Sequence, residues 1–291
     1  MAETGEIRSI RTLGLSLATR HRLCSKRRKF RRSDVGHKEF DGKAVLVTGA
    51  TSGIGEECAR AFAERGAKLL LTGRDESRGN TLLETLQAMG CEAAFHIGDV
   101  RNSAFCDSAV AACLEEFGRI DVLVNSAGIW QAKTTIDTDD ETWCAIMETN
   151  ASGTFFMCRA ALRAMCAQGS GNIINIASDW GLVGGAEAAA YCASKGAVVL
   201  MTKAMALDHA RDNIRVNALC PTDTDTPMMD QDYRDRGIDL EEGRRNSANS
   251  IPVGRMATAR DVADAACFMA SDKAAFLTGV ALPIDGGATA V

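Results

Sequence analysis

The chain contains few aromatic residues. Phe, Trp and Tyr make up 5% of its 291 residues, whereas apolar residues make up 46% and charged residues 24%. These proportions are ordinary for a globular protein with a substantial core. Scarce aromatics and abundant Gly and Ala favour close packing of helices on a sheet over a sandwich of aromatic-rich strands. We find no internal repeat and no low-complexity tract.

The sequence also lacks long apolar runs. None reaches the roughly 18 residues that a membrane-spanning helix needs. The best candidate, residues 186–207, is interrupted by Lys195 and Lys203. We therefore expect a soluble protein with no membrane partner.

Disulfide and metal-ligand spacings are missing as well. The 11 cysteines include no C-x-x-C pair, and the four histidines lie far apart in the sequence. Many of the cysteines lie in apolar segments, as expected for small buried hydrophobic residues in a reducing compartment. The sequence therefore predicts a cytoplasmic protein, and it offers no metal site that ligand spacing would reveal.

The first 40 residues differ from the rest in charge. They contain 11 Lys and Arg against 4 Asp and Glu, a net charge of +7, whereas the other 251 residues contain 22 against 34, a net charge of −12. This basic segment could bind an acidic surface or nucleic acid, act as a transit peptide, or be a disordered extension. We favour a disordered extension over residues 1–39, followed by one domain over 40–291. The acidic remainder makes nucleic-acid binding by that domain an unfavourable hypothesis.

From residue 43 onward, short apolar runs alternate with longer helical patterns. The predicted strands cover residues 44–48, 68–72, 93–97, 121–125, 172–177, 215–219 and 280–284. The predicted helices cover residues 55–65, 77–88, 103–117, 139–168, 188–210 and 259–271. Such alternation indicates an α/β fold: a single doubly wound Rossmann-type domain with a parallel seven-stranded sheet and helices on both faces. Ligands of these folds bind beyond the carboxyl ends of the strands.

The first strand leads into a glycine-rich turn before a helix. Gly49, Gly53 and Gly55 permit a tight turn, close approach of the backbone to a pyrophosphate, and close packing of helix on strand. The N-terminus of the helix offers free N–H groups and a partial positive charge to phosphates. Because the strand–turn–helix context is correct, we predict a dinucleotide site here.

A second pattern places Tyr191 four residues before Lys195, so that the two side chains share one helix face. A phenol ordinarily titrates near pH 10, and a nearby ammonium lowers its pKa. A tyrosine tuned in this way can exchange a proton with a carbonyl or hydroxyl oxygen. By itself, however, the Y-x-x-x-K pattern is common in helices without function.

Together these motifs resemble those of the short-chain dehydrogenase/reductase family in its compact form. The first matches the fingerprint T-G-x-x-x-G-I-G over residues 48–55, and the second matches Y-x-x-x-K. Ser178 precedes Tyr191 by 13 residues, as in the family, and residues 125–128 resemble the family's N-N-A-G with Ser in second place. Asn150 matches the helix asparagine of the family. The resemblance covers residues 40–291.

The resemblance implies a role for each matching residue. Tyr191 would be the general acid/base, Lys195 its tuner and a ribose ligand, Ser178 the residue that orients the substrate oxygen, and Asn150 the support of a proton-relay water. Residues 221–228 resemble P-G-x-V-x-T-P-M, with Thr222 in place of the usual glycine. The implied cofactor-binding set is Gly49, Thr51, Ser52, Gly53, Ile54, Gly55, Arg74, Asp99, Val100, Asn125, Ala127, Gly128, Tyr191, Lys195, Pro221, Thr224 and Thr226.

The end of the second predicted strand bears on the choice of cofactor. A carboxylate there would favour the 2′-hydroxyl of NAD, but the sequence has Gly73 followed by Arg74. A guanidinium would contact the 2′-phosphate of NADP in a charge-assisted hydrogen bond of about 1.5–3 kcal/mol. We therefore predict NADP(H), with NAD(H) as the alternative. Asp75 is expected to compete for Arg74, and the glycine-rich turn has no second basic residue.

The substrate is less legible. Candidate pocket residues are Asp179, Trp180, Gly181, Gly185 and Glu187, together with the charged segment 228–251. That segment is interpreted either as a mobile lid or as a solvated pair of surface helices.

The sequence therefore predicts an oxidoreductase that moves a hydride between a nicotinamide cofactor and a secondary alcohol or ketone. The alternative is a catalytically silent dinucleotide-binding sensor or scaffold. The resemblance further implies a homodimer or homotetramer, formed through the long helices near residues 151–168 and 188–210.

Overall fold

A parallel sheet of seven strands forms the centre of the domain. The computed structural model describes residues 38–290, so the expectations for the basic segment up to residue 37 lie outside the described residues. The strands are β1 (Ala44–Thr48), β2 (Lys68–Gly73), β3 (Ala93–Ile97), β4 (Val122–Asn125), β5 (Gly171–Ile176), β6 (Ile214–Pro221) and β9 (Ala281–Ile284). Their order in the sheet is β3-β2-β1-β4-β5-β6-β9, and every pairing is parallel. The predicted fold class and all seven predicted strands are confirmed.

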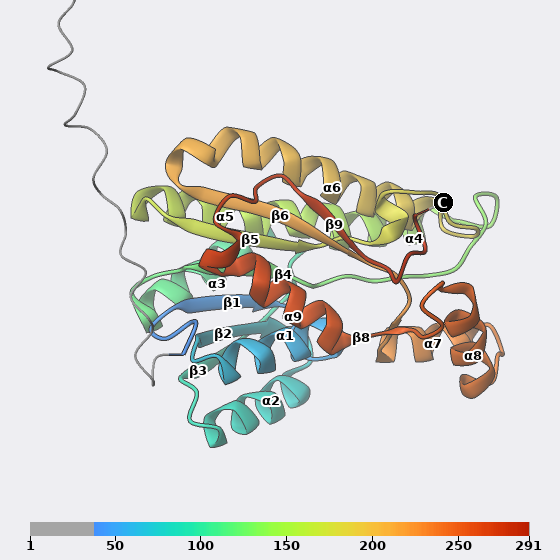
Figure 1. Ribbon diagram of the computed structural model, residues 1–291, viewed down its shortest axis with the longest axis horizontal. Helices are drawn as coiled ribbons and strands as arrows, with labels where there is room; N and C mark the ends of the chain where they lie inside the picture. Colours follow the sequence, from blue (N-terminus) through green and yellow to red (C-terminus); the bar gives the residue numbers. More distant parts are fainter. Residues whose placement is uncertain (1–37, 291) are drawn as a thin grey trace, which may run out of the picture. The chain divides into compact units, whose positions relative to one another are not determined.

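Helices cover both faces of this sheet (Figure 1). One face packs against α1 (Gly53–Glu64), α2 (Glu76–Ala88) and α9 (Ala259–Ala270). The other face packs against α3 (Ser103–Phe117), α5 (Gly153–Gln168) and α6 (Ala189–His209). None of the helices in residues 38–290 combines the length and the apolar character that crossing a bilayer requires.

Side chains of β1 show how the two cores are built. Val45 and Val47 are buried in the core on the α1 side, whereas Ala44 and Leu46 are buried in the core on the α5 side. Successive side chains of a strand point to opposite faces, so a strand buried on both faces must be apolar throughout. This explains why the strands were legible in the sequence as short continuous apolar runs.

One predicted helix is interrupted. Residues 139–168 were expected to form a single helix, but the structure has α4 (Asp140–Ile146), a π-helical turn (Met147–Ser152) and then α5. Asn150 lies within the π-helical turn and is completely buried. Such turns break the regular i→i−4 hydrogen bonding and are frequent at functional sites.

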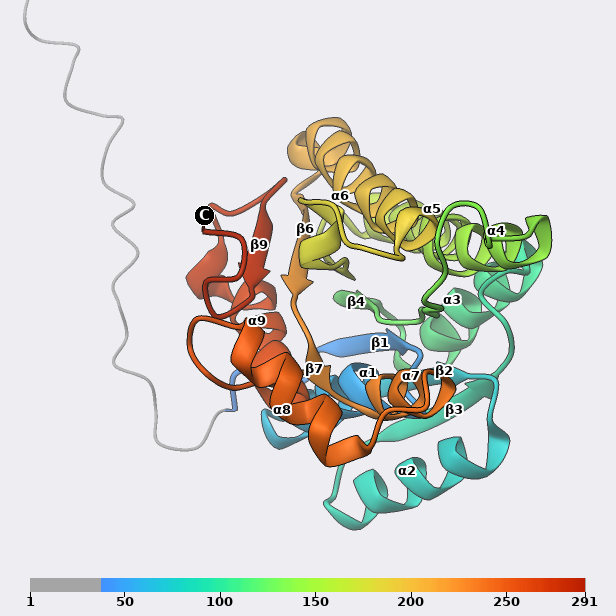
Figure 2. The same cartoon turned by 90° about the vertical axis from the view of Figure 1, so that its right-hand side faces the viewer.

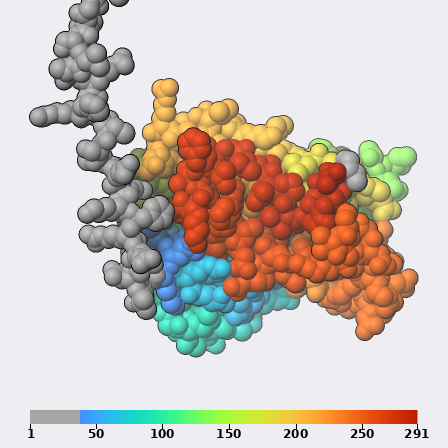
Figure 3. All heavy atoms as spheres, viewed as in Figure 1, coloured from blue at the N-terminus to red at the C-terminus, as the bar shows by residue number. Residues whose placement is uncertain are grey.

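Charged helices lie at the carboxyl edge of the sheet. Segment 228–251 contributes to α7 (Pro227–Asp235) and α8 (Leu240–Ser250), and the short strands β7 (Thr224–Asp225) and β8 (Ala257–Thr258) pair beside them. Figure 2 shows α7 and α8 in front of the sheet, and Figure 3 shows them as the orange lobe at one end of the surface. The segment is thus helical, while its action as a lid stays a prediction.

The turn from β1 into α1 is closely packed. A Cβ on Gly55 would lie 2.2 Å from the carbonyl oxygen of Gly49, and one on Gly49 would lie 2.7 Å from the Cα of Ala127. Gly49 also has a φ of +63°, which disfavours other residues. At the other end of α1, Gly66 has a φ of +89° and follows the C-cap Arg65.

We predict that Gly55→Ala lowers the free energy of unfolding by about 1–3 kcal/mol, because the added methyl group must displace backbone atoms. Gly196→Ala is the matched control. This glycine lies inside α6, where the nearest atom to an added Cβ is 3.8 Å away. The control should gain about 0.5–1 kcal/mol from reduced backbone entropy. Denaturant titration measures both, and equal stabilities of the two variants would contradict the packing described.

Candidate active site

A cleft of about 680 Å³ lies at the carboxyl edge of the sheet. It is lined by residues that follow several strands, as expected near the point where the strand order reverses between β1 and β4. Most of the predicted site residues line it: Gly49, Thr51, Ser52, Gly53, Ile54, Arg74, Asp99, Val100, Ala127, Gly128, Ser178, Tyr191, Lys195, Pro221, Thr224 and Thr226. Three predicted residues do not line the cleft: Gly55, Asn125 and Asn150.

The N-terminus of α1 opens into the cleft without a side-chain cap. Within the described chain, the Ser52 hydroxyl makes no capping hydrogen bond at this helix, whereas Asp75, Asn102 and Asp139 cap the helices that follow them. Backbone N–H groups at a helix start otherwise need an external acceptor. The turn therefore presents unpaired donors and a partial positive charge, which suit a phosphate.

Arg74 is available for an anion. Its side chain is 61% exposed, and its nearest carboxylate is Asp99, at 3.9 Å. Asp75 does not compete for it, contrary to expectation, because Asp75 caps α2 and pairs with Arg78 at 3.3 Å. Arg78 also lines the cleft and supplies a second basic side chain that the sequence reasoning missed. The sequence signal that could have revealed Arg78 is its place in the first turn of α2, four residues after Arg74.

Two of the predicted cofactor-binding residues, Asp99 and Asn125, are held by side-chain hydrogen bonds within the protein. Burial alone would raise the pKa of Asp99, but hydrogen bonds from Arg101 lower it, so Asp99 stays a carboxylate. The Asn125 amide is buried and donates to Asn175 at 2.9 Å. Asn125 thus ties β4 to β5 and does not line the cleft. Thr222 is outside the positive-φ region, so the chain accommodates a branched residue where the family pattern has glycine.

The buried amine of Lys195 donates to the carbonyl oxygen of Ile176 at 2.8 Å. Its nitrogen lies 5.6 Å from the centre of the Tyr191 ring. Burial lowers the pKa of Lys195 to about 8, because the charged form loses its hydration. The Tyr191–Lys195 spacing therefore produces the predicted proximity.

The expected lowering of the Tyr191 pKa is not found. Burial raises the pKa of the phenol above its ordinary value, and this effect exceeds the opposing hydrogen bond with Ser178. Tyr191 is therefore a neutral phenol at physiological pH. A neutral phenol is the form that can donate a proton to a carbonyl oxygen.

Ser178 lies at the end of β5 next to a second carboxyl group. Its hydroxyl donates to Asp179 at 2.9 Å and accepts from the backbone N–H of Trp180 at 3.2 Å. Burial raises the pKa of Asp179, although hydrogen bonds to the carboxyl oppose this shift.

Asn150 links the π-helical turn to α6, the helix that carries Tyr191 and Lys195. Its side-chain oxygen accepts from the backbone N–H of Ile129 at 2.8 Å, and its amide donates to Ile129 and to Ser194. Ser194 in turn donates to the backbone carbonyl of Tyr191 at 2.8 Å. The π-helical turn thus links α6 to the loop after β4. Through these hydrogen bonds the Asn150 side chain fixes the position of α6 relative to the loop after β4.

Aromatic rings form one wall of the cleft. Trp130 makes edge-to-face contacts with Trp180 and Tyr191, with ring centres 5.2 Å and 5.1 Å away. The Trp130 indole donates to Asp232 on α7 at 2.9 Å, which joins this wall to the helical segment. Sequence reasoning identified Trp180 and the segment 228–251 that contains Asp232, but it missed Trp130, since no motif marks that residue.

A second connection across the cleft involves Glu187. Its φ of +55° is unusual for a residue with a side chain, and its carboxylate pairs with Arg236 at 3.2 Å. Gly181 and Gly185, which were expected to line the pocket, instead allow close packing. A Cβ on Gly181 would lie 2.8 Å from the carbonyl of Lys195, and one on Gly185 would lie 2.6 Å from the Trp180 ring.

Comparisons with known proteins find related oxidoreductases. Residues 49–289 match the family described as enoyl-(acyl carrier protein) reductase. The chain is 39% identical to an uncharacterized oxidoreductase of Thermotoga maritima, covering 87% of this chain and 99% of the relative. It is 38% identical to meso-2,3-butanediol dehydrogenase of Serratia marcescens, covering 86% and 96%. The crystal structure of an actinorhodin polyketide ketoreductase with NADPH superimposes with a TM-score of 0.81 at 38% identity, covering 84% of this chain and 97% of that one.

The buried amine predicts a pH-dependent stability difference. The pKa of Lys195 is lower in the folded protein than in the unfolded chain. Between pH 8 and the ordinary pKa of a lysine, the unfolded chain therefore binds more protons than the folded protein. In that range the contribution of Lys195 to the free energy of unfolding rises with pH. Lys195→Met lacks this gain. Its free energy of unfolding, minus that of the wild type, should therefore fall by about 1.4 kcal/mol per pH unit above pH 8.

The measurement is denaturant unfolding between pH 7 and 9.5. The matched control is Lys203→Met, which removes an exposed amine from the same helix. A Lys195→Met difference that stays constant with pH, as the control should, would contradict the burial of a charged amine.

Proposed function

We propose that this chain, which belongs to the short-chain dehydrogenase/reductase family, prefers NADP(H) and uses Tyr191 as the proton donor. It is an NAD(P)-dependent oxidoreductase that acts on CH–OH groups and the corresponding carbonyls. The observation that supports the finer proposal best is the shared cleft, whose lining includes Arg74 and Arg78 as well as Ser178, Tyr191 and Lys195. No finding favours the alternative of a catalytically silent sensor or scaffold.

The cleft fits a dinucleotide. Gly49 and Gly55 let the turn pack closely on the neighbouring backbone, and the uncapped N-terminus of α1 offers donors for the pyrophosphate. Arg74 and Arg78 would hold a 2′-phosphate, and no carboxylate occupies position 73 at the end of β2. The ketoreductase similar to this chain was crystallised with NADPH, which is in accord with the same preference here. A bound nicotinamide supplies or accepts the hydride.

Protein side chains supply the proton. The neutral Tyr191 phenol donates to the carbonyl oxygen of the substrate during reduction. The Ser178 hydroxyl, which donates to Asp179 in this structure, turns to donate to that oxygen and orients it. Lys195 places a positive charge near the phenol and stabilises the phenolate left behind. Asn150 keeps α6 in register through Ser194.

We further propose a cytoplasmic homo-oligomer, a homodimer or homotetramer. Ten cysteines in the described part of the chain are free thiols, which suits a reducing compartment. The outer faces of α5 and α6 expose Phe155, Leu200 and Leu207, the last two by 66% and 83%. Large apolar side chains gathered on neighbouring helices favour association with another copy.

Arg74→Ala should lower the preference for NADPH over NADH by about 10- to 150-fold, since it removes a charge-assisted contact of about 1.5–3 kcal/mol. Equilibrium binding of both dinucleotides measures the ratio. Arg163→Ala, which removes a guanidinium of similar exposure from α5, is the control. An unchanged ratio in Arg74→Ala would refute the role of Arg74 as the phosphate ligand.

Tyr191→Phe removes the proton donor while leaving the ring and its contacts with Trp130. We expect the rate of carbonyl reduction to fall by about 10²–10⁴-fold, the usual contribution of a positioned acid. Dinucleotide affinity serves as the internal control and should stay within a few-fold of wild type. Full activity in this variant would show that another group supplies the proton.

A further inference from the structure

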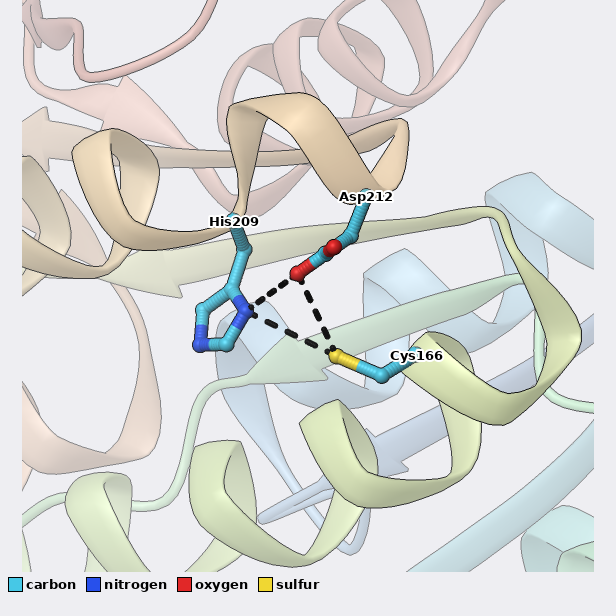
Figure 4. A group of neighbouring side chains, drawn as sticks. All are labelled: Cys166, His209 and Asp212. Atoms are coloured by element: carbon cyan, nitrogen blue, oxygen red, sulfur yellow. Dashed lines mark hydrogen bonds and ion pairs between the residues drawn. The ribbon is translucent and has the colours of Figure 1, made fainter.

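A group of three possible metal ligands lies away from the cleft, where α5 and α6 end. It comprises Cys166 in the last turn of α5, His209 at the end of α6, and Asp212 in the turn that follows (Figure 4). Within residues 38–290 it is the one group of three or more His, Cys, Asp or Glu whose ligand atoms all lie within 4.8 Å of one another. His209 and Asp212 follow Cys166 in the sequence by 43 and 46 residues, so a short ligand-spacing motif could not reveal the group.

The distances between the ligand atoms suit zinc. The Cys166 sulfur lies 3.6 Å from Nδ1 of His209 and 3.6 Å from Oδ2 of Asp212, and the nitrogen and oxygen lie 3.0 Å apart. In a tetrahedral zinc site with bonds of about 2.3 Å to sulfur and about 2.0–2.1 Å to nitrogen and oxygen, sulfur stands about 3.5 Å from the lighter ligands, and these stand about 3.3 Å apart. The triangle therefore needs only a small expansion between His209 and Asp212 to hold the ion.

The ligand types also select this metal. Thiolate, imidazole and carboxylate together suit Zn²⁺, whereas Mg²⁺ and Ca²⁺ are bound by oxygen ligands. Cys166 and His209 lie in the last turns of their helices, where the partial negative charge of the helix dipole favours a cation.

We propose that Cys166, His209 and Asp212 form a zinc site whose fourth position is open to water. The site joins the end of α5 to the end of α6. Tyr191 lies 18 positions before His209 on the same helix, which places the two about 27 Å apart along its axis. Zinc at this position takes no part in hydride transfer. Its effect is to fix the packing of the two helices that carry the exposed apolar faces.

The test uses the full chain, freed of metal with a chelator and titrated with Zn²⁺ against a chromophoric competitor. The wild type should bind one tight equivalent. Cys166→Ser, His209→Ala and Asp212→Asn should each weaken it by more than about 100-fold, because loss of an outer-sphere partner alone costs about 10–100-fold. The control Cys144→Ser removes another exposed thiol, on α4, and should bind as the wild type does.

Two further readouts identify the ligands and the effect. Co²⁺ in the wild type should show thiolate-to-metal charge-transfer absorption that is absent in Cys166→Ser. Zn²⁺ should raise the melting temperature of the wild type and of Cys144→Ser, but not of the three ligand variants. Dinucleotide-dependent turnover should be the same with and without zinc. Equal Zn²⁺ affinity in the wild type and Cys166→Ser, an absence of tight binding in the wild type, or Co²⁺ bound without thiolate absorption would each overturn the proposal.

Discussion

The fold and its site depend on the close approach of β1 and α1 at the glycine-rich turn. Gly55 lies so near the carbonyl of Gly49 that a single methyl group would not fit. This contact brings the start of α1 directly to the carboxyl edge of the sheet, where its N–H groups remain uncapped. The same turn packs against the backbone of Ala127 after β4, on the far side of the switch point. The position of α1 and the proposed phosphate site therefore depend on this close contact.

The proposed proton transfer depends on a second constraint, the burial of charged and polar groups at the cleft. Lys195 keeps an amine inside the protein because Ile176 accepts its hydrogen bond, at the cost of a lowered pKa. The same burial keeps Tyr191 protonated, so the phenol is held ready to donate. Asn150 and Ser194 fix the helix that carries both groups. The geometry of the proposed catalytic residues is thus maintained by buried hydrogen bonds, which are costly to break.

Local patterns were sufficient for much of this architecture. Strand Ala44–Thr48 was predicted to the residue because an apolar run buried on both faces has a clear signature. Helical spacing likewise predicted that Tyr191 would lie near its lysine. By contrast, the hydrogen bond between Trp130 and Asp232 joins residues 102 positions apart, and no local pattern encodes such a contact. The π-helical turn at Asn150 was also missed, because the sequence there keeps a continuous helical pattern.

Tryptophan fluorescence tests the central claim, that the cleft binds a dinucleotide beside Tyr191, most directly. Trp130 and Trp180 line the cleft, whereas Trp143 lies exposed on α4. Titration of the wild-type chain with NADPH should quench tryptophan emission saturably, with one dinucleotide per chain and energy transfer to the nicotinamide. Absence of quenching by NADPH and NADH alike would contradict the account, since no dinucleotide would then occupy the cleft.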